Sequence, residues 1–133
     1  MMVYLLDTNI VSDLVRNPQG SAAARVDKIA DEQICTSIIV AAELRYGVAR
    51  KNSPGLKVEV EIVLASMNIL PLDCPVDRIY GDLRAELDKR GRLIGPNDLL
   101  IAAHALARGC TLVTDNVREF SRVKNLTVEN WLR

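Results

Sequence analysis

The sequence predicts an α/β fold: a three-layer sandwich around a central, roughly five-stranded parallel sheet, formed as one domain over residues 1–133. The length supports this, because 133 residues suit one domain that buries a substantial core. The composition supports it as well, because 49% hydrophobic residues argue against a disordered chain. The order of elements supports it most, because short apolar runs alternate with stretches of helical spacing, as in parallel strands joined by crossovers.

Five short, mostly apolar runs predict the strands. The first is continuous and ends at Asp7, which suits a strand buried on both faces of a sheet. Turn-forming or helix-forming segments separate it from the others. The five predicted strands cover 3–6, 34–38, 68–73, 111–114 and 126–128.

Apolar residues at helical spacing predict a helix or a pair of helices between most of these strands. Ser21 is placed to cap the second helix, Pro75 to occupy the first position of a later one, and Gly109 to end the last. The polar segment 51–55 is interpreted as a break between helices. The predicted helices cover about 10–15, 21–31, 39–50, 58–67, 75–91 and 95–108.

The charge balance and the cysteine content limit the classes of function that the chain could have. The 17 basic and 17 acidic residues cancel, so contact with a nucleic acid would depend on local basic patches. Cys35, Cys74 and Cys110 form no metal-binding pair, and they are expected to be small buried hydrophobes in a reducing cytosol. No leader peptide and no membrane-spanning stretch are recognisable. We therefore expect a cytoplasmic protein with no membrane contact.

Four carboxylates occupy unusual places. Asp7 and Asp115 follow the first and fourth predicted strands, at the edge of an open α/β sheet where ligands bind. Glu43 shares a helical stripe with apolar neighbours, where a charge is unfavourable unless it is paired or bound to a metal. Asp98 begins a helix that is apolar almost all round.

Each carboxylate also has a structural interpretation. Asp7 would cap the following helix, Asp98 would interact with a helix dipole, and Asp115 would be a turn residue. Glu43 would point to solvent if its helix were rotated, or would pair with Arg45 or Arg50. Taken singly, the structural interpretation is favoured for Asp98 and Asp115, is about even for Asp7 and is disfavoured for Glu43.

Taken together, the four favour a metal site. Like charges ~5 Å apart repel by about 3 kcal/mol at an effective dielectric constant near 20, so such a cluster needs compensation. An all-oxygen set favours Mg²⁺, with Mn²⁺ as a substitute, over zinc. The one histidine, His104, lies two turns from Asp98 and is interpreted as a packing or surface residue. The implied chemistry is attack on a phosphodiester by a metal-activated water, with one ion or two.

The chain resembles the PIN-domain ribonucleases, and among them the VapC toxins of bacterial type II toxin–antitoxin pairs. Order and spacing of the matching motifs agree along essentially the whole chain. The motifs are Leu5-Leu6-Asp7-Thr8-Asn9, Ala42-Glu43-Leu44-Arg45-Tyr46-Gly47, Ile94-Gly95-Pro96-Asn97-Asp98 with Ile101-Ala102-Ala103, Leu112-Val113-Thr114-Asp115-Asn116 with Arg118-Glu119-Phe120, and Val128-Glu129-Asn130-Trp131.

The resemblance implies a set of site residues. Asp7, Glu43 and Asp98 would form the acidic core, with Asp7 and Asp98 as the principal Mg²⁺ ligands. Relatives vary between an acid and an amide at the fourth catalytic position, so that it falls on Asp115 or on Asn116. The hydrogen-bonding residues expected behind the ligands are Thr8, Asn9 and Ser37.

The resemblance also implies partners. We expect a homodimer, and a higher hetero-oligomer with a cognate VapB-type antitoxin that inserts a basic side chain into the acidic pocket. The substrate would be structured RNA, often tRNA, and the most similar relatives indicate initiator tRNA. The basic residues that would select the RNA, or would be ordinary solvated charges, are Arg45, Lys51, Arg84 and Arg92.

Three other functions fit the sequence less well than this one. A haloacid-dehalogenase-type phosphatase needs a second Asp two residues after the first, where this chain has Asn9. A receiver-like signalling domain needs an acidic pair and a lysine that are not evident. A degenerate nuclease retained for binding is the best rival from a different class, and the complete set of Asp7, Glu43 and Asp98 argues against it.

Overall fold

A computed structural model describes residues 2–132 and confirms the predicted α/β class. Five parallel strands form one sheet in the order β3-β2-β1-β4-β5. Seven α-helices and one short 3₁₀ helix connect the strands in the described part of the chain. The strands are β1 Tyr4–Leu6, β2 Ile34–Ser37, β3 Asn68–Leu70, β4 Thr111–Val113 and β5 Val128–Glu129.

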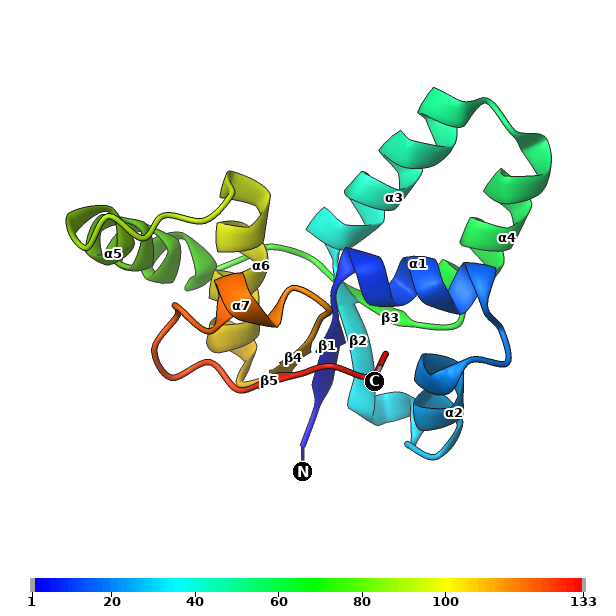
Figure 1. Cartoon of the computed structure of the whole chain (residues 1–133), viewed down its shortest axis with the longest axis horizontal. Helices are drawn as coiled ribbons and strands as arrows, with labels where there is room; N and C mark the ends of the chain where they lie inside the picture. Colours follow the sequence, from blue (N-terminus) through cyan, green and yellow to red (C-terminus); the bar gives the residue numbers. More distant parts are fainter. Residues whose placement is uncertain (1, 133) are drawn as a thin grey trace.

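Helices cover both faces of this sheet, as right-handed crossovers require. The connections from β1 to β3 lie on one side of it and those from β3 to β5 on the other (Figure 1). The first group is α1 Thr8–Arg16, α2 Ser21–Asp27, the 3₁₀ helix η1 Asp31–Gln33, α3 Ile38–Lys51 and α4 Pro54–Ala65. The second group is α5 Val76–Lys89, α6 Pro96–Arg108 and α7 Val117–Phe120.

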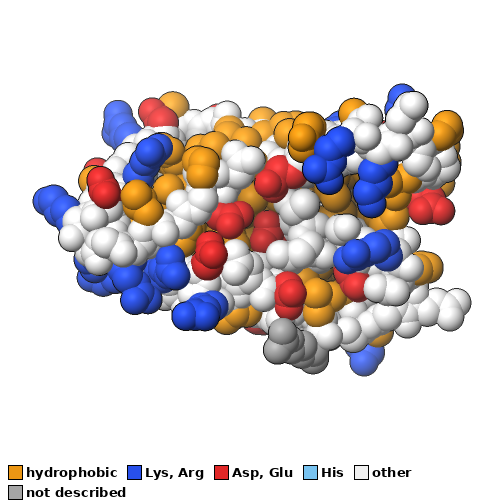
Figure 2. All heavy atoms as spheres, turned by 45° about the horizontal axis from the view of Figure 1, so that its top comes forward, with side chains coloured by type: hydrophobic (Ala, Val, Ile, Leu, Met, Phe, Trp, Pro, Cys, Tyr) orange, Lys and Arg blue, Asp and Glu red, His pale blue; other side chains and the backbone are white. Residues whose placement is uncertain are grey.

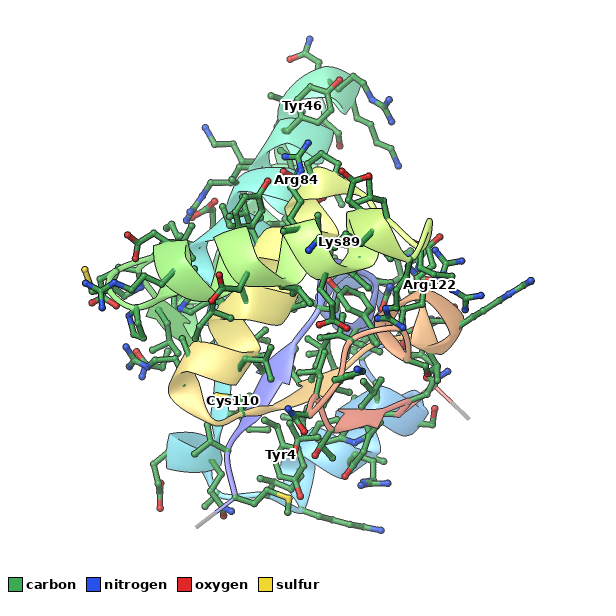
Figure 3. All side chains as sticks on the ribbon, turned by 90° about the vertical axis from the view of Figure 1, so that its left-hand side faces the viewer. Tyr4, Tyr46, Arg84, Lys89, Cys110 and Arg122 are labelled. Atoms are coloured by element: carbon green, nitrogen blue, oxygen red, sulfur yellow. The ribbon has the colours of Figure 1, made fainter. Side chains whose placement is uncertain are left out.

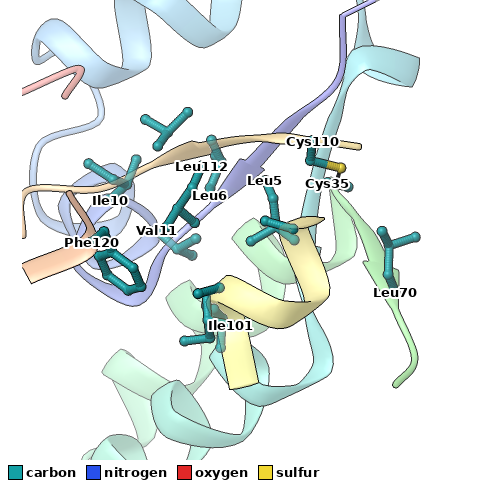
Figure 4. Packing of buried hydrophobic residues seen from close by; sticks show 14 of the residues in the cluster. Leu5, Leu6, Ile10, Val11, Cys35, Leu70, Ile101, Cys110, Leu112 and Phe120 are labelled. Atoms are coloured by element: carbon teal, nitrogen blue, oxygen red, sulfur yellow. Dashed lines mark hydrogen bonds between the residues drawn. The ribbon is translucent and has the colours of Figure 1, made fainter. Parts of the chain in front are cut away.

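The central strand β1 explains why the core is continuous through the sheet. Leu5 and Leu6 point to opposite faces because they are successive residues of one strand, and both are fully buried. Leu5 pairs in register with Cys35 on one side and with Leu112 on the other. Figure 4 shows these residues at the centre of the apolar cluster.

The strand order places the site. Chain connections run outward from β1 to β2 in one direction, whereas β4 lies on the other side of β1. The ends of β1 and β4 are therefore neighbours at the point where the direction of the crossovers reverses, which is where α/β sheets bind ligands. The backbone N–H of Asp7 donates to the carbonyl of Val113 at 2.9 Å and holds these two ends together.

Several predicted boundaries were wrong for local reasons. The segment interpreted as a break contains the start of α4, because Ser53 Oγ accepts from Leu56 N at 3.3 Å and Pro54 occupies the first turn. Helix α2 ends at Asp27 and η1 follows it. Strand β3 ends at Leu70, because Pro71 has no N–H to continue the ladder. The fifth strand lies later than predicted, at Val128–Glu129.

Three side chains differ from their predicted roles. Ser21 does not cap α2, because its hydroxyl donates to the Trp131 carbonyl at 3.0 Å and Gly20 is the N-cap residue. Pro75 lies one residue before α5. Cys74 is exposed, whereas Cys35 and Cys110 are buried as predicted, with their sulfur atoms 4.0 Å apart. Gly109 ends α6 with a φ of 66°, as predicted.

None of the helices in residues 2–132 has the length and apolar character that crossing a membrane requires.

Leu112→Ala should lower the free energy of unfolding by about 2–5 kcal/mol, because the side chain is fully buried in a central strand. Leu93→Ala is the matched control, since Leu93 is 42% exposed, and it should change stability by less than about 0.5 kcal/mol. Urea titration measures both. A loss no larger for Leu112→Ala than for Leu93→Ala would contradict the packing described above.

Candidate active site

Asp7 is the most constrained carboxylate of the site. It follows β1 directly and is 3% exposed. Its Oδ1 accepts from Thr8 N at 2.8 Å, and its Oδ2 accepts from Thr114 Oγ1 at 2.7 Å and from Asn9 Nδ2 at 3.3 Å. Burial raises the pKa of Asp7; the Thr114 and Thr8 hydrogen bonds oppose that rise and the charge of Glu43 adds to it. Asp7 thus caps α1 and also belongs to a group of like charges.

Asp98 lies in the first turn of α6, beside the same group. It is partly buried, on the face that carries the buried residues Ile101, Ala102 and Ala105. Burial, followed by the charges of nearby carboxylates, raises the pKa of Asp98 to about 6. The charges that contribute belong to Asp7, Glu43 and Glu119, and a hydrogen bond with the Asn116 side chain acts in the opposite direction.

Glu43 completes the group from α3, but not from the inward face that its sequence pattern predicted. The buried residues of α3 are Val40, Ala41, Leu44 and Val48, so the helix is rotated and Glu43 lies at the edge of the buried face, half-buried. Its Oε1 accepts from Thr8 Oγ1 at 2.5 Å. Its Oε2 accepts from Asn97 Nδ2 at 3.4 Å. These two donors explain how a carboxylate is held there.

The loop after β4 contains the two candidates for the fourth catalytic position, and their surroundings differ. Asp115 is exposed, and its Oδ1 accepts from Asn130 Nδ2 at 3.0 Å. Asn116 is partly buried, and its side chain lies near enough to Asp98 to lower the pKa of that carboxyl. The geometry therefore favours Asn116 over Asp115 as the neighbour of the acidic group.

The three residues expected behind the ligands have different surroundings. Thr8 contacts Asp7 through its backbone and Glu43 through its hydroxyl. Asn9 donates to Asp7, and its Oδ1 accepts from Asp115 N at 2.9 Å, which ties the loop after β4 to the start of α1. Ser37 is hydrogen-bonded elsewhere.

Ser37 and His104 form a separate buried pair. Ser37 Oγ lies 2.8 Å from His104 Nδ1 and accepts from Ile39 N at 3.1 Å. His104 is fully buried, and burial lowers the pKa of its ring. His104 is therefore a packing residue, and the pair connects the start of α3 to α6.

Sequence reasoning missed three residues of the site. Thr114 is fully buried and bonds Asp7; a polar residue ending an apolar strand was the available signal. Asn97 precedes Asp98 and donates to Glu43. Glu119 adds charge near Asp98 from α7, a helix that the apolar pattern did not predict.

The donor set suits a hard divalent cation. Figure 2 shows Asp and Glu side chains gathered in the middle of this face, with Lys and Arg side chains on both sides. Among residues 2–132, no three Asp, Glu, His or Cys side chains converge closely enough to hold an ion by themselves. Mg²⁺ keeps several water ligands and is commonly held by one or two carboxylates, so it does not require three converging side chains. Burial and, after it, neighbouring negative charge raise the pKa values of Asp7 and Asp98, and a bound cation would favour their charged forms.

The four basic residues that the sequence suggested for RNA contact differ in whether they already interact with other side chains of the protein. Arg45 makes two bonds to Glu61, at 2.9 and 3.0 Å, which neutralise its charge. Arg84 donates to a tyrosine hydroxyl on its own helix at 2.7 Å. Lys51 and Arg92 are exposed.

Comparison with known proteins identifies the family. A family model described as PIN domain matches residues 4–126. Ribonuclease VapC2 of Rickettsia felis is 41% identical over 132 residues, which cover 98% of each chain. The tRNA(fMet)-specific endonuclease VapC of Shigella flexneri is 36% identical over 132 residues, 98% of this chain and 99% of that one.

A solved structure extends the likeness to three dimensions. The crystal structure of VapBC2 from Rickettsia felis, bound to a DNA fragment from its promoter, superposes with a TM-score of 0.92. The identity there is 40%, and the match covers 98% of this chain and 99% of that one. The chain therefore belongs to the PIN-domain family, among its VapC ribonucleases.

Proposed function

We propose that the chain is a Mg²⁺-dependent endoribonuclease that hydrolyses phosphodiester bonds in structured RNA by metal-activated water. The observation that carries the proposal is that Asp7, Glu43 and Asp98 lie near one another at the carboxyl edge of the sheet, where burial and neighbouring carboxylate charge raise the pKa values of Asp7 and Asp98. Such a group is unfavourable without a cation and suited to phosphate chemistry with one.

Asp7 and Asp98 would hold the ion, with Mn²⁺ as a substitute for Mg²⁺. When bound, the ion lowers the pKa of a water ligand and neutralises charge on the phosphate oxygens. Thr114 and the backbone N–H of Thr8 orient the carboxylate of Asp7. Asn116, whose side chain lowers the pKa of Asp98, would orient that carboxylate.

Glu43 would act beside the reacting phosphate. Thr8 and Asn97 hold one of its oxygens each, so the carboxylate has a fixed direction before substrate arrives. From this position Glu43 accepts a hydrogen bond from the attacking water. Fixed donors of this kind reduce the reorganisation that the reaction would otherwise require.

The biological role that we propose is that of the toxin in a type II pair in the cytoplasm. A cognate VapB-type antitoxin would inhibit it by placing a basic side chain among the carboxylates, in competition with the metal. The solved relative is described as a VapBC complex, and the Shigella relative is named for initiator tRNA. These names support an antitoxin partner and a tRNA substrate. We further propose a homodimer that assembles with the antitoxin.

Asp7→Asn should lower the rate of Mg²⁺-dependent cleavage of a tRNA pool by more than about a hundredfold, because it removes a charged ligand worth several kcal/mol. The matched control is Asp31→Asn, since Asp31 is exposed in η1, just before the opposite end of β2. Gel analysis of end-labelled tRNA measures both rates. If wild type and Asp7→Asn were equally inert while both still bound a partner protein, the chain would be an interaction module. Release of phosphate from small monoesters, with RNA untouched, would favour a phosphatase.

Asn116→Ala should reduce RNA cleavage by about 10–100-fold, the usual effect of losing a residue that orients a metal ligand. Asp115→Ala should reduce it much less, because the Asp115 side chain is directed to Asn130. Initial rates at a fixed Mg²⁺ concentration compare the two variants. The reverse order of effects would assign the fourth position to Asp115.

Asp98→Asn should stabilise the metal-free protein at neutral pH but not at acid pH. Because the pKa of Asp98 is raised from 3.8 to about 6 by folding, protonation stabilises the folded state. That contribution is complete below about pH 4 and is lost as the pH rises through about 6. Urea titrations in a chelator measure the difference between wild type and variant at each pH. Adding Mg²⁺ at neutral pH should stabilise wild type more than the variant, and a pH-independent difference would contradict the assignment.

A further inference from the structure

A cavity of about 560 Å³ adjoins the acidic group on the side of α3. Its lining residues include Thr8, Glu43 and Asn97, so it is continuous with the acidic group. The rest of its lining includes residues that the proposed chemistry does not use. The cavity is therefore a second part of the site, next to the place where the phosphodiester is cleaved.

Tyr46 forms an exposed aromatic wall of this cavity. Its exposed fraction is 66%, whereas Tyr4 packs against the Trp131 ring with 5.1 Å between centroids and Tyr80 packs against the core. Figure 3 places Tyr46 on the outer part of α3, at the opposite end of the molecule from Tyr4. An exposed ring of this size at the edge of an active site is available to a ligand.

Two further residues of α3 complete the wall. The Arg50 guanidinium lies 5.8 Å from the centre of the Tyr46 ring, within the range of a cation–π contact. Gly47, which also lines the cavity, is in open space, because a Cβ added there would meet nothing within 4 Å apart from its neighbours in the chain and its own helix. Glu43, Tyr46 and Arg50 follow one another at intervals of three and four residues, so they share one face of the helix.

We infer that Tyr46 stacks on an unpaired base of the RNA substrate beside the cleaved phosphodiester, and that Arg50 binds the adjoining phosphate. Single-stranded RNA is commonly bound by aromatic stacking together with basic side chains on its backbone. From Glu43 to Arg50 the helix rises about 10 Å, which leaves room for a nucleoside between the two. The inference rests on the proposed function, because it names how that same site takes its substrate.

The inference is tested by measuring how tightly the protein binds two RNAs of equal base composition. Divalent cations are left out so that neither RNA is cleaved. One is a hairpin with an unpaired loop and the other is a blunt duplex. Tyr46→Ala should weaken hairpin binding by about fivefold to a hundredfold, the range measured for loss of one stacked base, and leave duplex binding unchanged. Tyr46→Phe keeps the ring and should stay within about threefold of wild type. Fluorescence anisotropy gives the dissociation constants.

Cleavage kinetics give a second measurement. Tyr46→Ala should raise KM for the hairpin by a similar factor and leave kcat unchanged, because the ring does not touch the reacting atoms. Ile62→Ala is the matched control: Ile62 is 64% exposed on α4, outside the cavity, and its truncation should change neither constant. Thermal melting of both variants verifies that they are folded.

An abasic scan of the hairpin identifies the base. Removing the stacked base should weaken binding by wild type and have no further effect on Tyr46→Ala, since the two changes remove the same interaction. Arg50→Ala should lower the salt dependence of binding by about one phosphate contact. Arg25→Ala is its control, because Arg25 also lies over an aromatic ring, that of Trp131, but on α2, away from the cavity.

The outcomes separate this inference from the proposed function. The inference would be overturned, and the proposed function would stand, if the wild type cleaved RNA and Tyr46→Ala left both the hairpin affinity and KM unchanged. An absence of cleavage would refute the function, while the binding measurements would still decide the inference. Loss of antitoxin binding in Tyr46→Ala, with RNA binding intact, would assign the surface to a protein partner and overturn the inference as well.

Discussion

The site depends on the hydrogen bond from Thr114 Oγ1 to Asp7 Oδ2, at 2.7 Å between two fully or nearly buried residues. A buried carboxylate is strongly unfavourable without such donors. The bond joins the end of β1 to the end of β4, and the backbone bond from Asp7 to Val113 fixes the same two ends. Asn9 then donates to Asp7 and accepts from the loop after β4. The strand pairing and the carboxylate geometry therefore support each other.

This arrangement sets function against stability within a small protein. The carboxylates of Asp7 and Asp98 have raised pKa values because burial and neighbouring charges disfavour ionisation. Sequence–structure consistency is high elsewhere, for example in the fully buried Leu5 and Leu112 pair at the centre of the sheet. Local conflicts confined to one edge of a well-packed sheet are expected of an active site. The stability that the apolar core supplies thus offsets the unfavourable free energy of the acidic group.

The sequence predicted the site residues whose positions are fixed by the end of a strand or the start of a helix. It did not predict those whose positions depend on how a helix is rotated or on the path of a loop. Asp7 and Asp98 were predicted because a strand end and a helix start fix where a residue lies. The prediction that Glu43 lies on the inward face of α3 was wrong. The rotation of α3 is set by its packing against other helices, and no local sequence pattern describes that packing. The choice between Asp115 and Asn116 was open, because a turn decides which of two successive side chains points inward.

Charge balance explains why α3 matters beyond its single carboxylate. The chain has no net charge, so its attraction for RNA is local. Arg45 on the same helix is already paired with Glu61, whereas Arg50 lies over an exposed ring beside the carboxylates. One helix face therefore presents a carboxylate, a flat aromatic surface and a cation in succession. An acidic group alone repels a polyanion, and a cation two turns along the same helix reduces that repulsion.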